Sequence, residues 1–224
     1  MKKAYAIVVL AMLALSSTLT GCVNFGGPSN APAVVFYVLN DAPTKPAAPA
    51  TSVAVAALKD SDPLRSKERV ESYAPTLLVL NTRTSSFYDT DQLIFSRSAD
   101  TRGQYQFARW TERPGKRFAD LMRTRLDHQG TWHVSAGGGY VRGDMLLDTE
   151  LVEFYHDATS EPGQVRLVLR AELLDMKQRK LLGRRVFEQQ VPLTSYDAAS
   201  AAQASSLAVS RVLDELAIWL ATLQ

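Results

Sequence analysis

The stretch from Val165 to Leu173 constrains the fold more than any other part of the sequence, because its residues alternate in polarity. Valine, leucine and alanine occupy the odd-numbered positions, and arginine or glutamate occupies three of the four even-numbered ones. A period of two places one set on the buried face of a strand and the other set in water. Apolar segments at 146–155 and 181–191 flank it, with a polar turn at 175–180. Three long neighbouring strands predict an antiparallel meander.

Shorter apolar or alternating runs predict further strands before this meander. Two of them, at 92–96 and 104–109, are separated by the turn-like sequence Ser-Ala-Asp-Thr-Arg-Gly and therefore predict a hairpin. The other predicted strands are 34–39, 52–58, 76–81 and 131–135.

Two segments show the three- and four-residue spacing of apolar side chains that predicts an amphipathic helix. The first has Pro114 in its first turn, where the missing N–H costs nothing, and ends near Gly130. The second covers residues 197–223 and has a broad apolar face. Trp110 and Trp219 are interpreted as core residues, with a lipid-contacting surface as the alternative. The pattern predicts an α/β fold of the α+β type: one domain with a mainly antiparallel or mixed β-sheet and two amphipathic helices packed against it.

The N-terminus has the composition of a secretory signal peptide. Lys2 and Lys3 precede an uncharged apolar run at 6–15. This run is too short to cross roughly 30 Å of hydrocarbon as a helix, which needs about 20 apolar residues. We therefore expect residues 1–21 to direct export and then to be removed.

The sequence Leu-Thr-Gly-Cys at 19–22 is similar to the lipobox of bacterial lipoproteins. In that class a diacylglyceryl group is attached to the thiol, signal peptidase cuts after a small residue, and the freed amine is acylated. We therefore expect Leu19 and Gly21 to be recognised by the peptidase and Cys22 to receive the acyl chains, palmitate among them. A lone cysteine is more commonly a buried thiol, but this position favours lipidation. Two or three acyl chains hold a protein stably on a membrane.

The sequence divides into three regions: the signal peptide 1–21, a Gly-, Pro- and Ser-rich flexible tether at 22–33, and a domain at 34–224. The domain contains a proline- and alanine-rich loop at 41–50. Val23 follows the cysteine in place of the aspartate that retains enteric lipoproteins in the inner membrane. That resemblance implies an outer-membrane location on the periplasmic face.

The composition is that of a folded, evenly charged chain, with 46% hydrophobic and 21% charged residues. Removal of residues 1–21 takes away Lys2 and Lys3, so 23 of the 25 basic residues remain in the mature chain, which equals the number of acidic residues, 23. Such a balance does not suggest a nucleic-acid partner.

The polar residues form no recognisable catalytic or metal-binding motif, and we name no catalytic residue or metal ligand. His128, His133 and His156 lack the spacing of metal ligands and are interpreted as surface or strand residues. The sequence has neither a Gly-x-Ser-x-Gly elbow nor a phosphate-binding Gly-x-x-x-x-Gly-Lys loop. The glycines at 137–139 are interpreted as a turn, because no helix start follows them.

Two groups of charged residues have a functional and a structural interpretation. Asp148, Glu150 and Glu153 resemble paired catalytic carboxylates, but strand alternation predicts that Glu150 and Glu153 lie on opposite faces as solvated edge charges. A basic cluster in and after the turn at 175–180 suits either anionic lipid headgroups and a partner, or a solvated hairpin. The cluster consists of Lys177, Arg179, Lys180, Arg184 and Arg185, and we name Arg184 and Arg185 as the candidate contacts to a partner or to lipid headgroups.

The order of several short sequences resembles the ABC-type transport auxiliary lipoproteins, the family of paraquat-inducible protein C. The resemblance covers most of residues 34–224 and lies in the order of the pieces. The stretch at 41–50 departs from the family pattern. The pieces are the lipobox, Phe36-Tyr37-Val38-Leu39, Phe87-Tyr88-Asp89, Leu93-Ile94-Phe95-Ser96-Arg97, Tyr105, Arg109-Trp110, Pro114, Leu121, Leu126, Leu151-Val152-Glu153-Phe154, Val165-Arg166-Leu167, Arg184-Arg185-Val186-Phe187 and Trp219-Leu220.

The resemblance implies a non-enzymatic component of a system that moves lipids between the inner and outer membranes. Its implied partners are an ABC permease and ATPase and a mammalian-cell-entry (MCE) domain protein that bridges the periplasm. It also implies a homo-oligomer and no cofactor beyond the covalent lipid on Cys22. Two other functions stay open: an assembly lipoprotein of a pilus or secretion machine, and a periplasmic hydrolase with a dispersed site.

Overall fold

The computed structural model describes residues 32–41, 74–139 and 141–223. The chain divides into two compact units, Met1–Ala33 and Val34–Gln224, and the second contains nearly all of the described residues. Several predictions fall outside the described residues: the signal peptide, Leu19, Gly21, Cys22, most of the tether at 22–33, the loop at 41–50 apart from residue 41, and the strand at 52–58.

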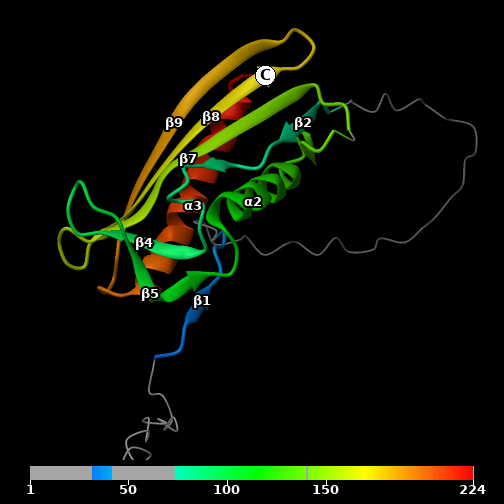
Figure 1. Cartoon of the computed structure of the whole chain (residues 1–224). Coiled ribbons are helices and arrows are strands. Elements are labelled where there is room, and N and C mark those ends of the chain that lie inside the picture. The colour runs from blue at the N-terminus through cyan, green and yellow to red at the C-terminus, as the bar shows by residue number, and fades with distance from the viewer. Residues whose placement is uncertain (1–31, 42–73, 140, 224) are drawn as a thin grey trace, which may run out of the picture. The chain divides into compact units, whose positions relative to one another are not determined.

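The described part of the second unit forms a mixed nine-stranded sheet and two helices, which confirms the predicted fold class (Figure 1). Its elements are β1 (Val35–Tyr37), β2 (Thr76–Val79), β3 (Arg83–Thr84), β4 (Gln92–Ser96), β5 (Gly103–Trp110), α2 (Pro114–His128), β6 (His133–Ala136), β7 (Met145–Asp157), β8 (Gln164–Asp175), β9 (Lys180–Pro192) and α3 (Ala198–Ala221).

The strands β7, β8 and β9 form the predicted antiparallel meander. Asp157 pairs with Gln164 at one end of β7, and Met145 pairs with Asp175 at the other. The buried face of β8 consists of the alternating apolar residues, because each of them has an exposed fraction of 0%. These residues are Val165, Leu167, Leu169, Ala171 and Leu173.

The other edge of β7 joins the meander to the shorter strands. β2, β3 and β4 each pair with β7 in parallel, and β6 extends the sheet by pairing with β2. β4 and β5 are antiparallel, as the predicted hairpin requires, and β1 lies parallel to β5. Within this unit, β1 therefore lies near the Asp157 end of β7, and the β8–β9 turn lies at the Met145 end (Figure 1).

The two helices begin where the sequence predicts. α2 starts at Pro114, and the carboxylate of Asp197 caps α3 by accepting a hydrogen bond of 2.7 Å from the Ser200 backbone N–H. α3 packs on β8 and β9, whereas α2 contacts β2 and β6. Their apolar faces and the inner face of the sheet form one core. Neither of these helices is long and apolar enough to cross a membrane.

A β-bulge in β7 makes one sequence prediction wrong. The register with β8 shifts between Leu151 and Glu153, so Val152 is an extra residue in β7. The buried side of the strand therefore changes from odd positions, ending at Leu151, to even positions, starting at Phe154. As a result, Glu150 and Glu153 lie on the same outer face and not on opposite faces. Nor are they edge charges, because β7 has strands on both sides.

Candidate functional site

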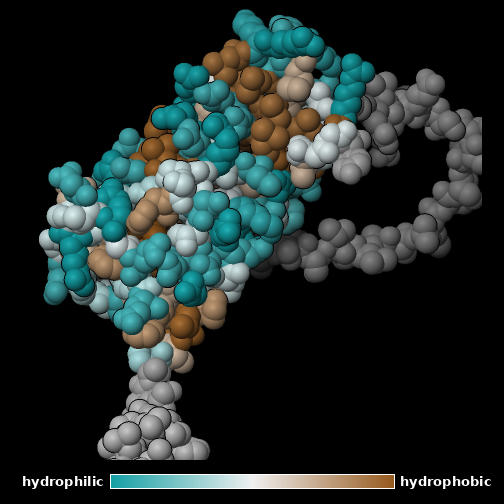
Figure 2. Space-filling model, in the orientation of Figure 1, coloured by the Kyte–Doolittle hydropathy of each residue, from teal (hydrophilic) through white to brown (hydrophobic). Residues whose placement is uncertain are grey.

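A hollow of about 460 Å³ lies at the end of the meander where the β8–β9 turn begins. We call it the turn hollow, and it combines cationic and apolar side chains. Two of its apolar members are strongly exposed, Val141 at 48% and Met176 at 43%. Figure 2 shows brown, apolar surface towards this end of the unit. Its lining residues are Leu78, Val141, Arg142, Gly143, Met176, Lys177 and Arg179.

One cation of the turn hollow is held by a carboxylate. Lys177 Nζ lies 2.6 Å from Asp144 Oδ1, and the other oxygen of Asp144 accepts a 2.9 Å hydrogen bond from the Thr76 backbone N–H. The hydrogen bond from Lys177 is the main reason that the pKa of Asp144 lies below its ordinary value, and the Thr76 N–H lowers it further. Lys177 thus helps to join the turn to β2 rather than being a free cation.

The predicted contact residues Arg184 and Arg185 lie on β9 and point to opposite faces of it. Arg184 Nε donates a 2.7 Å hydrogen bond to Glu172 on the outer face of the sheet. The guanidinium of Arg185 lies 5.0 Å from the ring centroid of Phe187, whose side chain is buried in the core. The basic cluster is therefore divided between the turn and two faces of a strand. A role of Arg184 and Arg185 in binding stays a prediction.

The carboxylates of β7 are paired with arginines on the outer face of the sheet. Glu150 accepts a 2.7 Å hydrogen bond from Arg170, and Glu153 accepts one from Arg166. The side chains of Glu150 and Arg170 are 31% and 43% exposed, and such surface pairs add at most about 1 kcal/mol to stability. The geometry indicates a charged sheet surface and not an acid–base pair.

The three histidines lie on the surface or in strands, as predicted, but His156 has a structural role that the sequence did not reveal. His128 and His133 are exposed, whereas His156 on β7 is only 2% exposed. Its Nε2 lies 3.0 Å from the Pro162 carbonyl oxygen, and its Nδ1 lies 2.8 Å from the Tyr105 hydroxyl. A neutral ring satisfies both contacts by donating from Nε2 and accepting at Nδ1.

Burial shifts both partners of this hydrogen bond towards their neutral forms. Desolvation lowers the pKa of His156 and raises the pKa of Tyr105 to about 12. The two rings also stack, with centroids 6.3 Å apart and an interplanar angle of 11°. The pair therefore joins β5 to β7.

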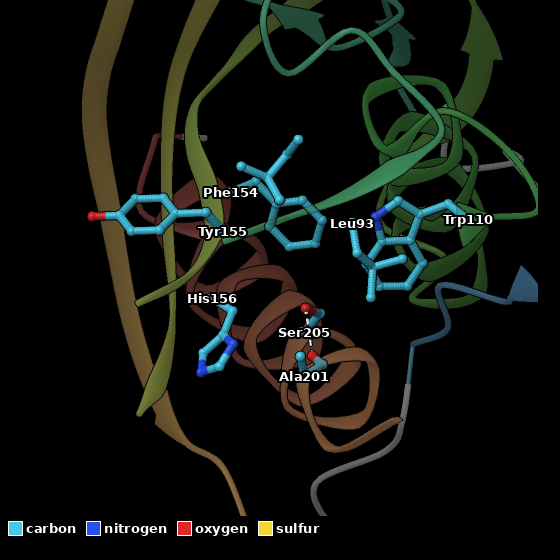
Figure 3. A pocket seen from close by; sticks show the side chains of 8 residues that line it. Leu93, Trp110, Phe154, Tyr155, His156, Ala201 and Ser205 are labelled. Atoms are coloured by element: carbon cyan, nitrogen blue, oxygen red, sulfur yellow. Dashed lines mark hydrogen bonds between the residues drawn. The ribbon is translucent and has the colours of Figure 1, made fainter. Parts of the chain in front are cut away.

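The two tryptophans singled out in the sequence are core residues, with Trp110 3% exposed and Trp219 7% exposed. Figure 3 shows Trp110 beside Leu93 and Phe154, while Tyr155 points to the other side of β7. The void between them has a volume of about 10 Å³, roughly that of a single water molecule. It is a gap in core packing and too small for a ligand.

Arg125 also has a structural role that the sequence pattern did not predict. The helical pattern places it within the apolar stripe of α2, but it forms ion pairs with Asp41, which follows β1, and with Asp214 on α3. A charged residue at a stripe position was the available signal, yet its partners lie 84 and 89 residues away in sequence. No group of three potential metal ligands comes together among residues 32–41, 74–139 and 141–223.

We compared the sequence and the fold of this chain with those of known proteins. The model of a family described as ABC-type transport auxiliary lipoprotein component matches residues 57–217. A solved structure from Xanthomonas campestris, assigned to family DUF330, is 21% identical with a TM-score of 0.61, and the match covers 66% of this chain and 85% of that one. A second structure, of an uncharacterized protein, is 13% identical with a TM-score of 0.58 and coverages of 66% and 92%. No curated protein matches the sequence.

Proposed function

This chain belongs to the family of ABC-type transport auxiliary lipoprotein components, and from that membership we propose that it is a non-catalytic, lipid-anchored part of an envelope lipid-transport system. The family match over residues 57–217 is the observation that supports the proposal most strongly. It confirms the resemblance found in the sequence.

The partners that we propose are an ABC permease with its ATPase and an MCE-domain protein that spans the periplasm. The lipoprotein docks the end of that bridge farthest from the inner membrane. Docking rather than catalysis agrees with the bonding of the polar side chains, because Glu150 bonds Arg170 and His156 bonds Tyr105.

The proposed location is the periplasmic face of the outer membrane, with the acyl chains on Cys22. Intact mass measurement of the protein from membranes tests the anchor. We expect the mature chain to begin at Cys22, with a diacylglyceryl group and a third acyl chain. A Cys22→Ala variant should retain residues 1–21. An unmodified mature chain would contradict the anchor.

We also propose that the protein forms a homo-oligomer. The resemblance to the family implies such an assembly. Mass photometry of the detergent-purified lipoprotein tests this, and a monomer at all concentrations would exclude it.

The transport role is tested by a pull-down of the tagged lipoprotein from detergent-solubilised membranes, followed by identification of co-purified proteins and lipids. We expect the permease, the ATPase and the MCE-domain protein, together with bound lipid. Recovery of secretin or pilus components in their place would support the assembly function instead. The Cys22→Ala variant is the matched control for contacts that depend on the anchor.

A further inference from the structure

The first strand of the unit, β1, exposes several apolar side chains in a row. Phe36 is 58% exposed, Val38 49%, Val35 48% and Val34 42%. Residues 32–38 contain no charged side chain. Figure 2 shows tan and brown surface at the end of the described part where Figure 1 places β1. We call these four side chains the β1 edge.

The apolar surface continues from the β1 edge into a groove of about 340 Å³ between β1 and the first turns of α3. Val38 belongs to both, and Tyr37, Ala199 and Ala202 line the groove further in. Val38 therefore joins the β1 edge to the apolar side chains of the groove, whose other lining residues, Asn40, Gln203 and Ser206, are polar.

The sheet has a second exposed edge, at β9, which differs from the β1 edge in its charge. β9 has Lys180, Arg184, Arg185 and Glu188 along its length, and charged side chains of this kind discourage edge-to-edge association. β1 pairs only with β5 among the described strands and has no such charge. The contrast indicates that β1, unlike β9, is covered by something apolar.

The position of β1 in the sequence places it near the proposed lipid anchor. Val34 follows Cys22 by 12 residues, a distance of at most roughly 40 Å for an extended chain. Of the described elements, β1 is thus the one closest along the chain to the proposed lipid anchor. The β8–β9 turn lies at the opposite end of β7.

We infer that the β1 edge is a membrane-contact surface. It rests on the periplasmic leaflet of the membrane that holds the acyl chains. Phe36 and Val38 enter the interface between headgroups and acyl chains, as the apolar side chains of peripheral proteins do. The acyl chains hold the protein at the membrane, and the β1 edge sets which end of the domain faces it. This inference rests on the proposed anchor at Cys22.

Fluorescence quenching by brominated lipid tests the inference in the full, acylated protein. The three native tryptophans, Trp110, Trp132 and Trp219, are 3%, 4% and 7% exposed and give a low quenching background. A Phe36→Trp variant adds a reporter on the β1 edge. Val141→Trp is the matched control, because Val141 is 48% exposed in the apolar turn hollow at the other end of the unit.

Each variant is reconstituted into vesicles of palmitoyl-oleoyl phosphatidylcholine or its dibrominated analogue. We expect the emission added by Phe36→Trp to fall by about half or more in brominated vesicles, because the inserted ring contacts acyl chains. The emission added by Val141→Trp should not change. Val38→Trp serves as a second reporter if circular dichroism shows that Phe36→Trp disturbs the fold.

Equal quenching of the two reporters, quenching at Val141→Trp alone, or no quenching would overturn the inference. A copy of this chain packed on β1 would also prevent quenching, and it would then be detected as an oligomer that Phe36→Ser disrupts. The proposed transport function fails separately, through the pull-down. A protein without acyl chains would overturn both the anchor and the membrane contact.

Discussion

Arg125 on α2 joins three parts of the chain, and its replacement by methionine is a quantitative test of the fold. Its guanidinium donates two hydrogen bonds to Asp41, one of them 2.8 Å long, and a third to Asp214 on α3. The hydrogen bond to Asp41 is the main reason that the pKa of Arg125 lies above its ordinary value. Asp41 also accepts a 2.7 Å hydrogen bond from Ser210. This network fixes the segment that follows β1 against both helices.

The expected cost follows from burial. The side chains of Arg125 and Asp41 are 21% and 19% exposed, and that of Asp214 is 39% exposed. Breaking a fully buried pair by removing one partner costs about 3–5 kcal/mol, and exposure reduces this figure. We therefore expect Arg125→Met to lower the free energy of unfolding by about 2–3 kcal/mol. For a domain of this size the melting temperature should fall by about 5–10 °C.

Urea unfolding, followed by tryptophan fluorescence, measures this change. The midpoint should fall while the denaturant dependence of the unfolding free energy stays constant. Arg113→Met is the control, because Arg113 and its partner Asp89 are 63% and 51% exposed, and we expect a change below about 0.5 kcal/mol. The reasoning is refuted if the two variants unfold at the same urea concentration. In a double-mutant cycle with Asp41→Asn, the two losses should be less than additive by about 1 kcal/mol or more.

Three other predictions concern the turn after β7, its buried histidine and the start of α3. Gly163 has φ of +83°, and a Cβ there would lie 2.3 Å from the Asp157 carbonyl oxygen, so Gly163→Ala should lower the free energy of unfolding by about 2–3 kcal/mol in a thermal unfolding experiment. Gly130→Ala is the control: Gly130 has φ of +70° but lies in open space, and its replacement should cost about 1 kcal/mol. Burial lowers the pKa of His156, so the unfolded chain binds the proton more readily than the folded one, and stability should decrease as the pH falls below about 6.5. His156→Gln should make this decrease smaller between pH 7.5 and 5.5, and an equal loss of unfolding free energy in the two proteins over this range would contradict the prediction. Asp197→Ala removes the cap of α3 and should cost about 1 kcal/mol, against little change for Asp197→Asn, when both are measured by urea unfolding.

The elements with local signals were predictable from sequence. Pro114 and Asp197 mark the helix starts because each acts within its own first turn. The odd-numbered apolar residues of β8 predicted a half-buried strand because a strand repeats every two residues. The turns that join the meander and the hairpin are short, so the neighbours in these pairs were also predictable.

The features that depend on distant parts of the chain were not. Leu77 pairs with Met145 in a parallel register that no local pattern specifies. The bulge at Val152 reversed the predicted facing of Glu153, and two adjacent apolar residues, Leu151 and Val152, were its one sign in the sequence. His156 resembled an ordinary strand residue because its partner, Tyr105, lies 51 positions away.

For the candidate site, the sequence located the charged groups but not their bonding. Glu172 holds Arg184, and Phe187 lies beside Arg185, so the predicted basic cluster is divided between two surfaces. Cross-strand partners depend on register, which composition does not reveal. The lipidation of Cys22 stays a prediction from the N-terminal sequence.

The length of β7 has a consequence for transport. Its 13 residues rise by about 3.3 Å each, so its ends are held roughly 40 Å apart by continuous pairing with β8. If the β1 end rests on the membrane, this strand determines the height above the lipid at which the turn hollow is presented. A bridge protein that docks there would then end at a fixed depth in the periplasm, and an oligomer would present all of its turns at one level.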